Sequence, residues 1–279
     1  MVFIVSIFFG QAIAEIELSK FQHPMPVIRE NQAFEELTAS MNGAYHPPSS
    51  AATRFYFVRH GESLGNRERI YAGQTLDVDL TEQGERDAMR AGQTFKALQE
   101  KEGWAFDHVF SSPSLRAIRT TEIALSQVIP QGREFQTDAR LREKHIGVFD
   151  GKPMDADYTR RTLKGEAEIE KLESFWERLN YKHDPADLQE ESLRQVFDRV
   201  AQFLLEKNGE TAFQGTNVFV GSHGGVLKTL LIAHAAIHQG IILEYHRFEA
   251  PNGSLLVIEV EEGNLKVIQT SGFKFRFGV

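Results

Sequence analysis

Two histidines and two arginines lie just beyond three short apolar runs of the chain. These are Arg59 and His60 after residues 55–58, Arg116 after residues 109–110, and His223 after residues 218–220. Planar guanidinium groups bind phosphoryl oxygens through charge-assisted hydrogen bonds, which are about twice as strong as neutral ones. Imidazole has an unperturbed pKa of about 6.5, so its neutral form is a competent nucleophile near pH 7. The combination indicates phosphoryl transfer through a covalent intermediate on His60.

Small residues beside these four groups suit the binding of a phosphate. Gly61 and Gly224 have no side chains, so their backbone N–H groups can approach an anion. A helix beginning near Val226 would point its positive end toward the same place. Ser63 and Asn66 are expected to touch the substrate through side-chain hydrogen bonds. We therefore predict Gly61, Ser63, Asn66 and Gly224 as substrate-binding residues.

A departing alkoxide needs a proton, so a carboxylic acid is expected close to the phosphate. Glu143 is the predicted proton donor, and Asp150 is its competitor. We predict no metal at the site, because ligand spacings such as H-x-x-x-H do not occur near His60 or His223. No cofactor is expected either.

The elements that would position these residues alternate between strands and helices. Apolar runs predict strands at 55–58, 109–110 and 218–220 and a hairpin of 254–260 with 265–270, and helical patterns predict helices at 81–102, 114–128, 191–208 and 226–236. This alternation favours a mainly parallel sheet with helices on both faces, a three-layer α/β/α sandwich. Sites in such sheets lie beyond the carboxyl ends of the strands, which is where the candidate residues stand.

Four short sequence blocks, in their order along the chain, resemble those of the histidine phosphatase superfamily, the group that contains the phosphoglycerate mutases. The matching blocks are Arg59-His60-Gly61, Ser111-Ser112-Pro113 with Arg116, Leu141-Arg142-Glu143 with Gly147-Val148-Phe149-Asp150-Gly151, and Ser222-His223-Gly224-Gly225. Four blocks in the right order are far more specific than any one of them. The resemblance covers residues 54–256 and implies a phosphoglycerate mutase-like fold.

The resemblance also implies a role for each catalytic candidate. His60 would take the phosphoryl group and Glu143 would protonate the leaving group. The other candidates would bind the phosphate, namely Arg59, Arg116 and His223. The stretch 153–189 departs most from the short members of the family, and substrate selection is expected there.

Net hydrolysis is predicted rather than mutase transfer. A mutase must hold its dephosphorylated intermediate and keep water away from the phosphohistidine, which demands additional basic contacts. Residues 152–170 carry mixed charge and offer no clear second anion site. Two alternatives stay open: a phosphoglycerate mutase-type phosphotransferase, and a non-catalytic phosphate-binding module on the same fold. The expected partner is a phosphorylated small molecule or a phosphoprotein.

Composition excludes several other classes of function. The 279 residues include 31 Lys and Arg against 39 Asp and Glu, a net charge of −8. An acidic surface repels a nucleic-acid backbone, so no nucleic-acid partner is expected. The chain has no cysteine, which removes disulfides, thiolate metal sites and cysteine nucleophiles. These features leave the oligomeric state open.

The N-terminus differs from the rest of the chain. An apolar run at 2–9 followed by Ala12-Ile13-Ala14 predicts a secretory signal peptide at 1–14, which is too short to cross a bilayer. No Lys or Arg precedes the run, and a misplaced start or a plain apolar N-terminus is the alternative. The predicted location is periplasmic or secreted, or cytoplasmic if this segment is not a signal. No stable membrane insertion is expected.

The residues between the signal and the folded domain are predicted to form an N-terminal extension and linker at 15–52. Within it, helical spacing predicts one helix at 30–41, and the two prolines and two serines at 47–50 are typical of a linker. The histidine phosphatase domain is expected at 53–279.

Overall fold

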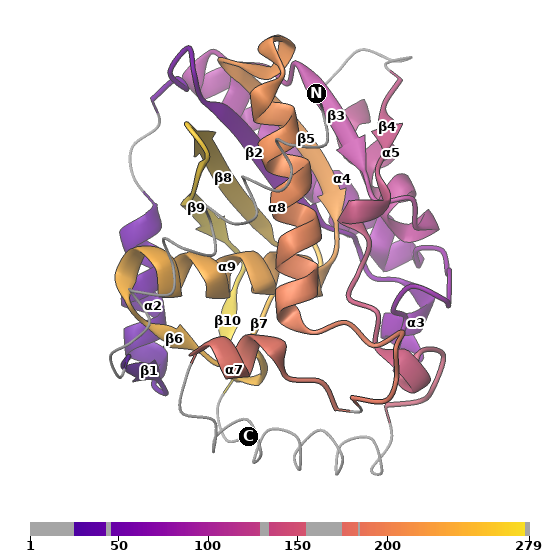
Figure 1. Cartoon of the computed structure of the whole chain (residues 1–279). Helices are drawn as coiled ribbons and strands as arrows, with labels where there is room; N and C mark the ends of the chain where they lie inside the picture. The colour runs from indigo at the N-terminus through magenta and orange to yellow at the C-terminus, as the bar shows by residue number, and fades with distance from the viewer. Residues whose placement is uncertain (1–24, 43–45, 129–133, 155–174, 184, 277–279) are drawn as a thin grey trace, which may run out of the picture.

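The computed structural model (Figure 1) describes residues 25–42, 46–128, 134–154, 175–183 and 185–276. The predicted signal peptide at 1–14 and residues 155–174 of the divergent stretch lie outside these ranges. No helix in the described part of the chain is both long and apolar enough to cross a membrane.

A six-stranded sheet forms the centre of the molecule, with the strand order β4-β3-β5-β2-β8-β9. Its strands are β2 (Thr53–Arg59), β3 (His108–Ser111), β4 (Gln136–Thr137), β5 (Thr216–Ser222), β8 (Leu255–Glu261) and β9 (Asn264–Ser271). The first four in that order run parallel, and β8 and β9 form an antiparallel hairpin beside β2. The predicted mainly parallel sheet is confirmed.

Helices cover both faces of this sheet (Figure 1). α4 (Glu82–Glu102) and α5 (Leu115–Ser126) pack on one face. α8 (Leu193–Gly209) and α9 (Gly224–Gln239) pack on the other face. The α/β/α sandwich that the alternation predicts is therefore confirmed.

Alternation along β2 explains why the sheet needs both layers. Phe55 and Phe57 enter the core under α8 and α9, whereas Tyr56 and Val58 enter the core under α4 and α5. Full burial of an apolar side chain of this size contributes roughly 1.5–3 kcal/mol. A strand that is apolar on both faces must be covered on both faces, and this strand ends at the catalytic candidates.

The helix ends near the strand ends follow from local capping. Thr81 accepts a hydrogen bond from the backbone N–H of Gly84 at 3.1 Å, which starts α4 where the sequence predicts. α9 begins two residues earlier than predicted, because His223 has an extended backbone and serves as its N-cap. The helix therefore starts directly at the turn that follows β5.

The described part of the N-terminal extension packs on the same core. The helix predicted at 30–41 is α2 (Asn31–Met41), which buries Phe34, Leu37 and Met41. Before it, β1 (Val27–Ile28) pairs in parallel with β6 (Ile242–Leu243).

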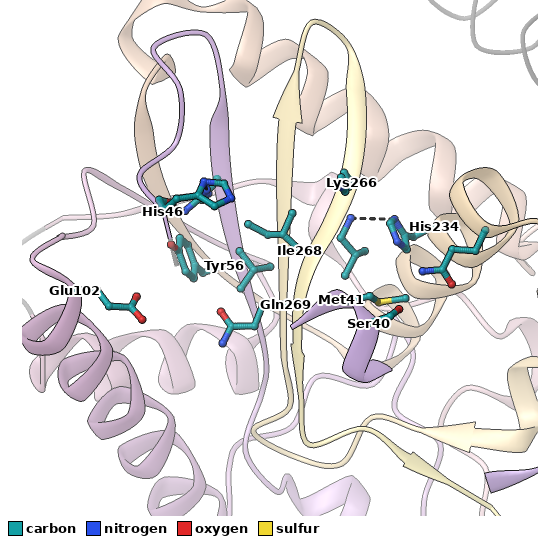
Figure 2. A pocket seen from close by; sticks show the side chains of 13 residues that line it. Ser40, Met41, His46, Tyr56, Glu102, His234, Lys266, Ile268 and Gln269 are labelled. Atoms are coloured by element: carbon teal, nitrogen blue, oxygen red, sulfur yellow. Dashed lines mark hydrogen bonds between the residues drawn. The ribbon is translucent and has the colours of Figure 1, made fainter. Parts of the chain in front are cut away.

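Side chains of α9 and of Asn42, the residue that follows α2, bond the edge strand β9. Figure 2 shows the bond to His234. The bonds run from the Val267 N–H to His234 Nδ1 (3.0 Å), from His238 Nε2 to the Leu265 carbonyl (2.7 Å), and from the Thr270 N–H to Asn42 Oδ1 (2.8 Å). Burial, with the nearby His238 and Lys266, lowers the pKa of His234 to about 4, so its ring is neutral and can accept at pH 7. A cavity of about 260 Å³ lies beside β9, and no predicted site residue lines it.

Short elements complete the described fold. They are α3 (Leu64–Arg67), α7 (Phe175–Asn180), β7 (Phe248–Glu249) paired with β10 (Lys274–Phe275), and single 3₁₀ turns at Ala139–Leu141, Gly147–Phe149, Thr211–Phe213 and Tyr245–Arg247. Elements this short have no periodic pattern, which is why the sequence does not predict them.

Candidate active site

Three neighbouring strands bring the predicted residues to one edge of the sheet. β3, β5 and β2 lie side by side and run parallel, so their carboxyl ends meet. His60 follows β2 and His223 follows β5, and their ring centroids are 5.2 Å apart. Arg116, in the first turn of α5, places its Nε 3.3 Å from His60 Nε2. Two imidazoles and a guanidinium thus share one buried space.

The backbone fixes which nitrogen of His60 can act as a nucleophile. His60 Nδ1 lies 2.8 Å from the carbonyl oxygen of Gly61. A carbonyl can only accept a hydrogen bond, so Nδ1 carries the proton and Nε2 keeps its lone pair. Arg116 Nε points at that lone pair, where a phosphoryl group would have to arrive. Binding of a phosphate would therefore move this hydrogen bond from the ring to a phosphoryl oxygen.

Burial keeps both histidines of the site uncharged. The pKa of His60 lies well below its ordinary value because the ring is buried, and Arg116 and Arg59 lower it further. The pKa of His223 is also lowered well below its ordinary value, chiefly by burial and then by Arg116. A neutral His60 is the nucleophilic form.

Two buried nitrogens of the site have no hydrogen-bond partner among the described residues. They are Arg59 Nε and His223 Nδ1. The rest of each side chain is anchored, because Arg59 Nη1 donates to the Ala250 carbonyl and His223 Nε2 lies 2.8 Å from Ser112 Oγ. An unsatisfied buried polar group costs roughly 1–3 kcal/mol. An anion bound between these groups would remove that cost.

The structure also shows that the packing around Gly61 and Gly224 favours glycine at both positions. A Cβ at Gly61 would overlap the backbone of Gly84, and the Gly61 N–H already donates to Thr120 Oγ1 at 3.0 Å. A Cβ at Gly224 would lie 3.1 Å from Arg59 Nε, so this glycine leaves room for the guanidinium. Contact of either glycine with a phosphate stays a prediction.

Ser63 and Asn66 form a capping box at the start of α3. Ser63 Oγ accepts from the Asn66 N–H, and Asn66 Oδ1 accepts from the Ser63 N–H. Asn252 Nδ2 donates to Asn66 Oδ1 at 3.1 Å and to the His60 carbonyl at 2.9 Å. These residues hold the loop that carries His60, and their contact with substrate stays a prediction. No motif marks Asn252, so sequence reasoning missed it.

Glu143 lies at the N-terminus of α9, beside the phosphate-binding candidates. Its Oε2 accepts from the Gly225 N–H at 3.1 Å, and its Oε1 accepts from the Lys144 N–H at 2.8 Å. A Cβ at Gly225 would overlap Oε1, so only glycine allows this approach. The carboxyl group is thus held where a leaving group of a phosphate on His60 could reach it.

The competing acid, Asp150, serves as a loop anchor. It accepts backbone hydrogen bonds from Gly73 at 2.9 Å and Thr75 at 2.6 Å. Partial burial would raise the pKa of Asp150, but the hydrogen bonds from these N–H groups outweigh it and lower the pKa. A carboxyl group whose pKa is lowered in this way is a poor proton donor.

Arg199 of α8 holds the loop that carries Glu143. It donates to the carbonyls of Arg142 (2.8 Å) and Glu143 (3.1 Å) and is paired with Glu191 at 2.8 Å. Gln74 Nε2 also donates to the Glu143 carbonyl, at 2.8 Å. Sequence reasoning missed Arg199, because an arginine among polar positions of an amphipathic helix is usually solvated.

We expect Arg199→Gln to slow the hydrolysis of alkyl phosphates by about 10- to 100-fold. Without Arg199 the loop that carries Glu143 should shift, and small misplacements of a catalytic group have effects of that size. The rate with p-nitrophenyl phosphate should fall much less, since its leaving group needs little protonation. Steady-state rates on both esters measure this difference. Arg194→Gln, on the same helix, is the matched control. Equal losses on both esters would instead indicate a general loss of structure.

Comparison with known sequences finds matches that cover most of the chain. The sequence model of the histidine phosphatase superfamily (branch 1) matches residues 55–271. A 2,3-bisphosphoglycerate-dependent phosphoglycerate mutase of Streptococcus pyogenes is 30% identical over 224 residues, which are 75% of this chain and 94% of that protein.

Comparison with solved structures finds the same architecture. A phosphoglycerate mutase from Bacillus anthracis str. Sterne matches with a TM-score of 0.61 at 23% identity, covering 79% of this chain and 93% of that chain. A mycobacterial glucosyl-3-phosphoglycerate phosphatase matches with a TM-score of 0.58 at 19% identity, covering 80% and 100%. Together these matches establish a phosphoglycerate mutase-like fold.

Proposed function

The chain belongs to the histidine phosphatase superfamily (branch 1), and from that membership we propose that it hydrolyses phosphomonoesters through a phosphohistidine on His60. The substrate is a phosphorylated small molecule or a phosphoprotein. Members of this family include both mutases and phosphatases, so membership alone does not decide between the two reactions.

In the first step, His60 Nε2 attacks phosphorus and the bond to the leaving oxygen breaks. Arg59, Arg116 and His223 hold the three non-bridging oxygens, over which negative charge spreads in the transition state. Glu143 gives its proton to the departing alkoxide, which leaves as a neutral alcohol. The enzyme is left with phosphate on His60 Nε2 and an ionised Glu143.

In the second step, water attacks the phosphorus of the phosphohistidine. Glu143 now accepts a proton from the water, and the bond between Nε2 and phosphorus breaks. Inorganic phosphate leaves, and His60 and Glu143 return to their starting protonation states. The same carboxyl group acts first as acid and then as base, as microscopic reversibility requires.

One observation carries this proposal: two buried nitrogens without a hydrogen-bond partner in the described part of the chain lie near an imidazole whose nucleophilic atom is fixed. His60 Nε2 has its lone pair because Nδ1 bonds to the Gly61 carbonyl. Arg59 Nε and His223 Nδ1, beside it, have no partner among the described residues. A phosphoryl group would supply acceptors to both and an electrophile to His60.

Mutase transfer is the second candidate, because the relative that is 30% identical is named a phosphoglycerate mutase. Ion pairing near the site favours hydrolysis. Lys144 lies 3.6 Å from Glu190, and Arg199 is paired with Glu191 at 2.8 Å. These two cations already have carboxylate partners, so they contribute little to retaining a bisphosphate.

We expect purified protein to release phosphate from p-nitrophenyl phosphate and from 3-phosphoglycerate without added 2,3-bisphosphoglycerate. Phosphate release and formation of 2-phosphoglycerate are followed in the same reaction. Isomerisation that outpaces phosphate release and depends on the bisphosphate would establish the mutase instead. Phosphate binding without any turnover would favour the non-catalytic module.

A further inference from the structure

A buried lysine near Glu143 has no part in the mechanism above. Lys228 lies on α9, one turn after Gly224, and its exposed fraction is 9%. Its Nζ lies 3.5 Å from the ring centroid of Tyr245 and 5.1 Å from that of Phe248. Within the described ranges, Lys228 makes neither a hydrogen bond nor an ion pair.

A buried ammonium group without a counter-ion is unfavourable, and the two aromatic rings compensate for it only in part. Burial lowers the pKa of Lys228 well below its ordinary value, and Arg276 and Arg59 lower it further. The carboxylates of Glu143 and Glu249 offset this lowering only in part. The other buried lysine near the proton donor, Lys144, differs because Glu190 lies 3.6 Å from its Nζ. Lys228 therefore occupies a position where an incoming anion would be stabilising.

The position of Lys228 relates it to the leaving group. Helix side chains point back toward the N-terminus, so Lys228 reaches toward the turn at Gly225. The Gly225 N–H bonds to Glu143, and a Cβ at Gly225 would lie 3.1 Å from the Tyr245 hydroxyl. The ring of Tyr245 thus extends from the ammonium group toward the proton donor. The part of a substrate beyond its scissile oxygen would lie on this side.

We propose that Lys228 binds a second anionic group of the substrate, a carboxylate or a phosphate carried by the leaving alcohol, while Tyr245 holds the ammonium group in place. The assignment rests on the proposed function, because it takes Glu143 as the group that faces the leaving alcohol. It specifies the substrate class as phosphomonoesters with one further anionic group. The anion provides the counter-ion that the described chain does not.

The test compares two ligands that differ only in the group of interest. 3-Phosphoglycerate carries a carboxylate where glycerol 3-phosphate carries a hydroxymethyl group. Their inhibition constants against p-nitrophenyl phosphate hydrolysis are measured for the wild type, Lys228→Met and Lys228→Arg. Methionine keeps an unbranched apolar chain against Tyr245, and arginine keeps the charge. Lys207→Met, which removes a lysine of α8 from the rings of Phe110 and Phe213, is the matched control.

The wild type should bind 3-phosphoglycerate at least about 10-fold more tightly than glycerol 3-phosphate. Lys228→Met should abolish this preference, with a loss of about 10- to 100-fold for 3-phosphoglycerate and a much smaller loss for glycerol 3-phosphate. Lys228→Arg should retain most of the preference, and Lys207→Met all of it.

Equal affinities of the wild type for the two ligands would overturn the proposal, whether or not the variants fold. Parallel losses for both ligands in a folded Lys228→Met protein would also overturn it. If p-nitrophenyl phosphate is not hydrolysed, the proposed hydrolysis fails. Calorimetric titration of the same two ligands into the wild type then decides the role of Lys228 separately.

Discussion

Replacing His60 by alanine should reduce turnover of p-nitrophenyl phosphate by about 10⁴-fold or more, because removal of a covalent nucleophile has effects of this size. The neighbouring cations would remain, so phosphate binding should persist. A labelled substrate with an alkaline quench, which preserves acid-labile phosphohistidine, should mark His60 in the wild type and leave the variant unlabelled. His108→Gln, which alters an exposed contact to the Ala212 carbonyl, is the control. Near-normal activity of His60→Ala would refute the assignment.

The burial of His60 also predicts how kcat/KM depends on pH. Burial and the two nearby arginines lower the pKa of His60, so protonation of the nucleophile requires a lower pH than for an ordinary histidine. As pH falls from 7, kcat/KM should not decline through His60 until well below about 6.5, the unperturbed value. A decline of kcat/KM centred at the ordinary histidine pKa, and still present in variants of the other histidines, would contradict the buried environment of His60.

Replacing Glu143 by glutamine should slow the hydrolysis of alkyl phosphates by about 10²- to 10⁴-fold, which is the usual contribution of general acid–base catalysis. Glutamine preserves the shape of the side chain but cannot give a proton to the alkoxide. p-Nitrophenolate leaves without much help, so its ester should be affected far less in the first step. Rates over a series of leaving groups of increasing pKa measure the effect as a steeper dependence in the variant.

Asp150→Asn is the informative comparison for Glu143→Gln. Asp150 anchors the loop 73–76 through backbone N–H groups, so its replacement should slow all esters alike and lower the thermal stability. If Glu143→Gln gave this uniform pattern instead, Glu143 would have a structural role. The pair of variants thus separates proton donation from loop support.

The elements that carry the site could be predicted because their signals are local. β2 contains the uninterrupted apolar run 55–58, and Thr81 caps α4 through its own side chain. His60 and His223 directly follow such strands, so the parallel pairing of β2 with β5 is enough to bring them together. Short motifs attached to strongly patterned elements are therefore readable from the sequence.

The supporting residues could not be predicted because their roles depend on tertiary contacts. Arg199 and Lys228 lie on helices whose pattern shows only which side is apolar, and Asn252 lies in a loop without a motif. The N–H of Gly61 also illustrates the limit, since only the fold shows that Thr120 already binds it. Sequence identifies the reactive groups, and the packed structure identifies what holds and surrounds them.

The side-chain bonds on β9 also affect how copies of this chain can meet. An edge strand with unpaired backbone groups is a template onto which a second chain can add a strand, which leads to aggregation. On β9, three such groups are already bonded to His234, His238 and Asn42. The opposite edge, β4, is only two residues long and offers little to pair with. Both edges of the sheet therefore offer few backbone groups to which a strand of another molecule could add.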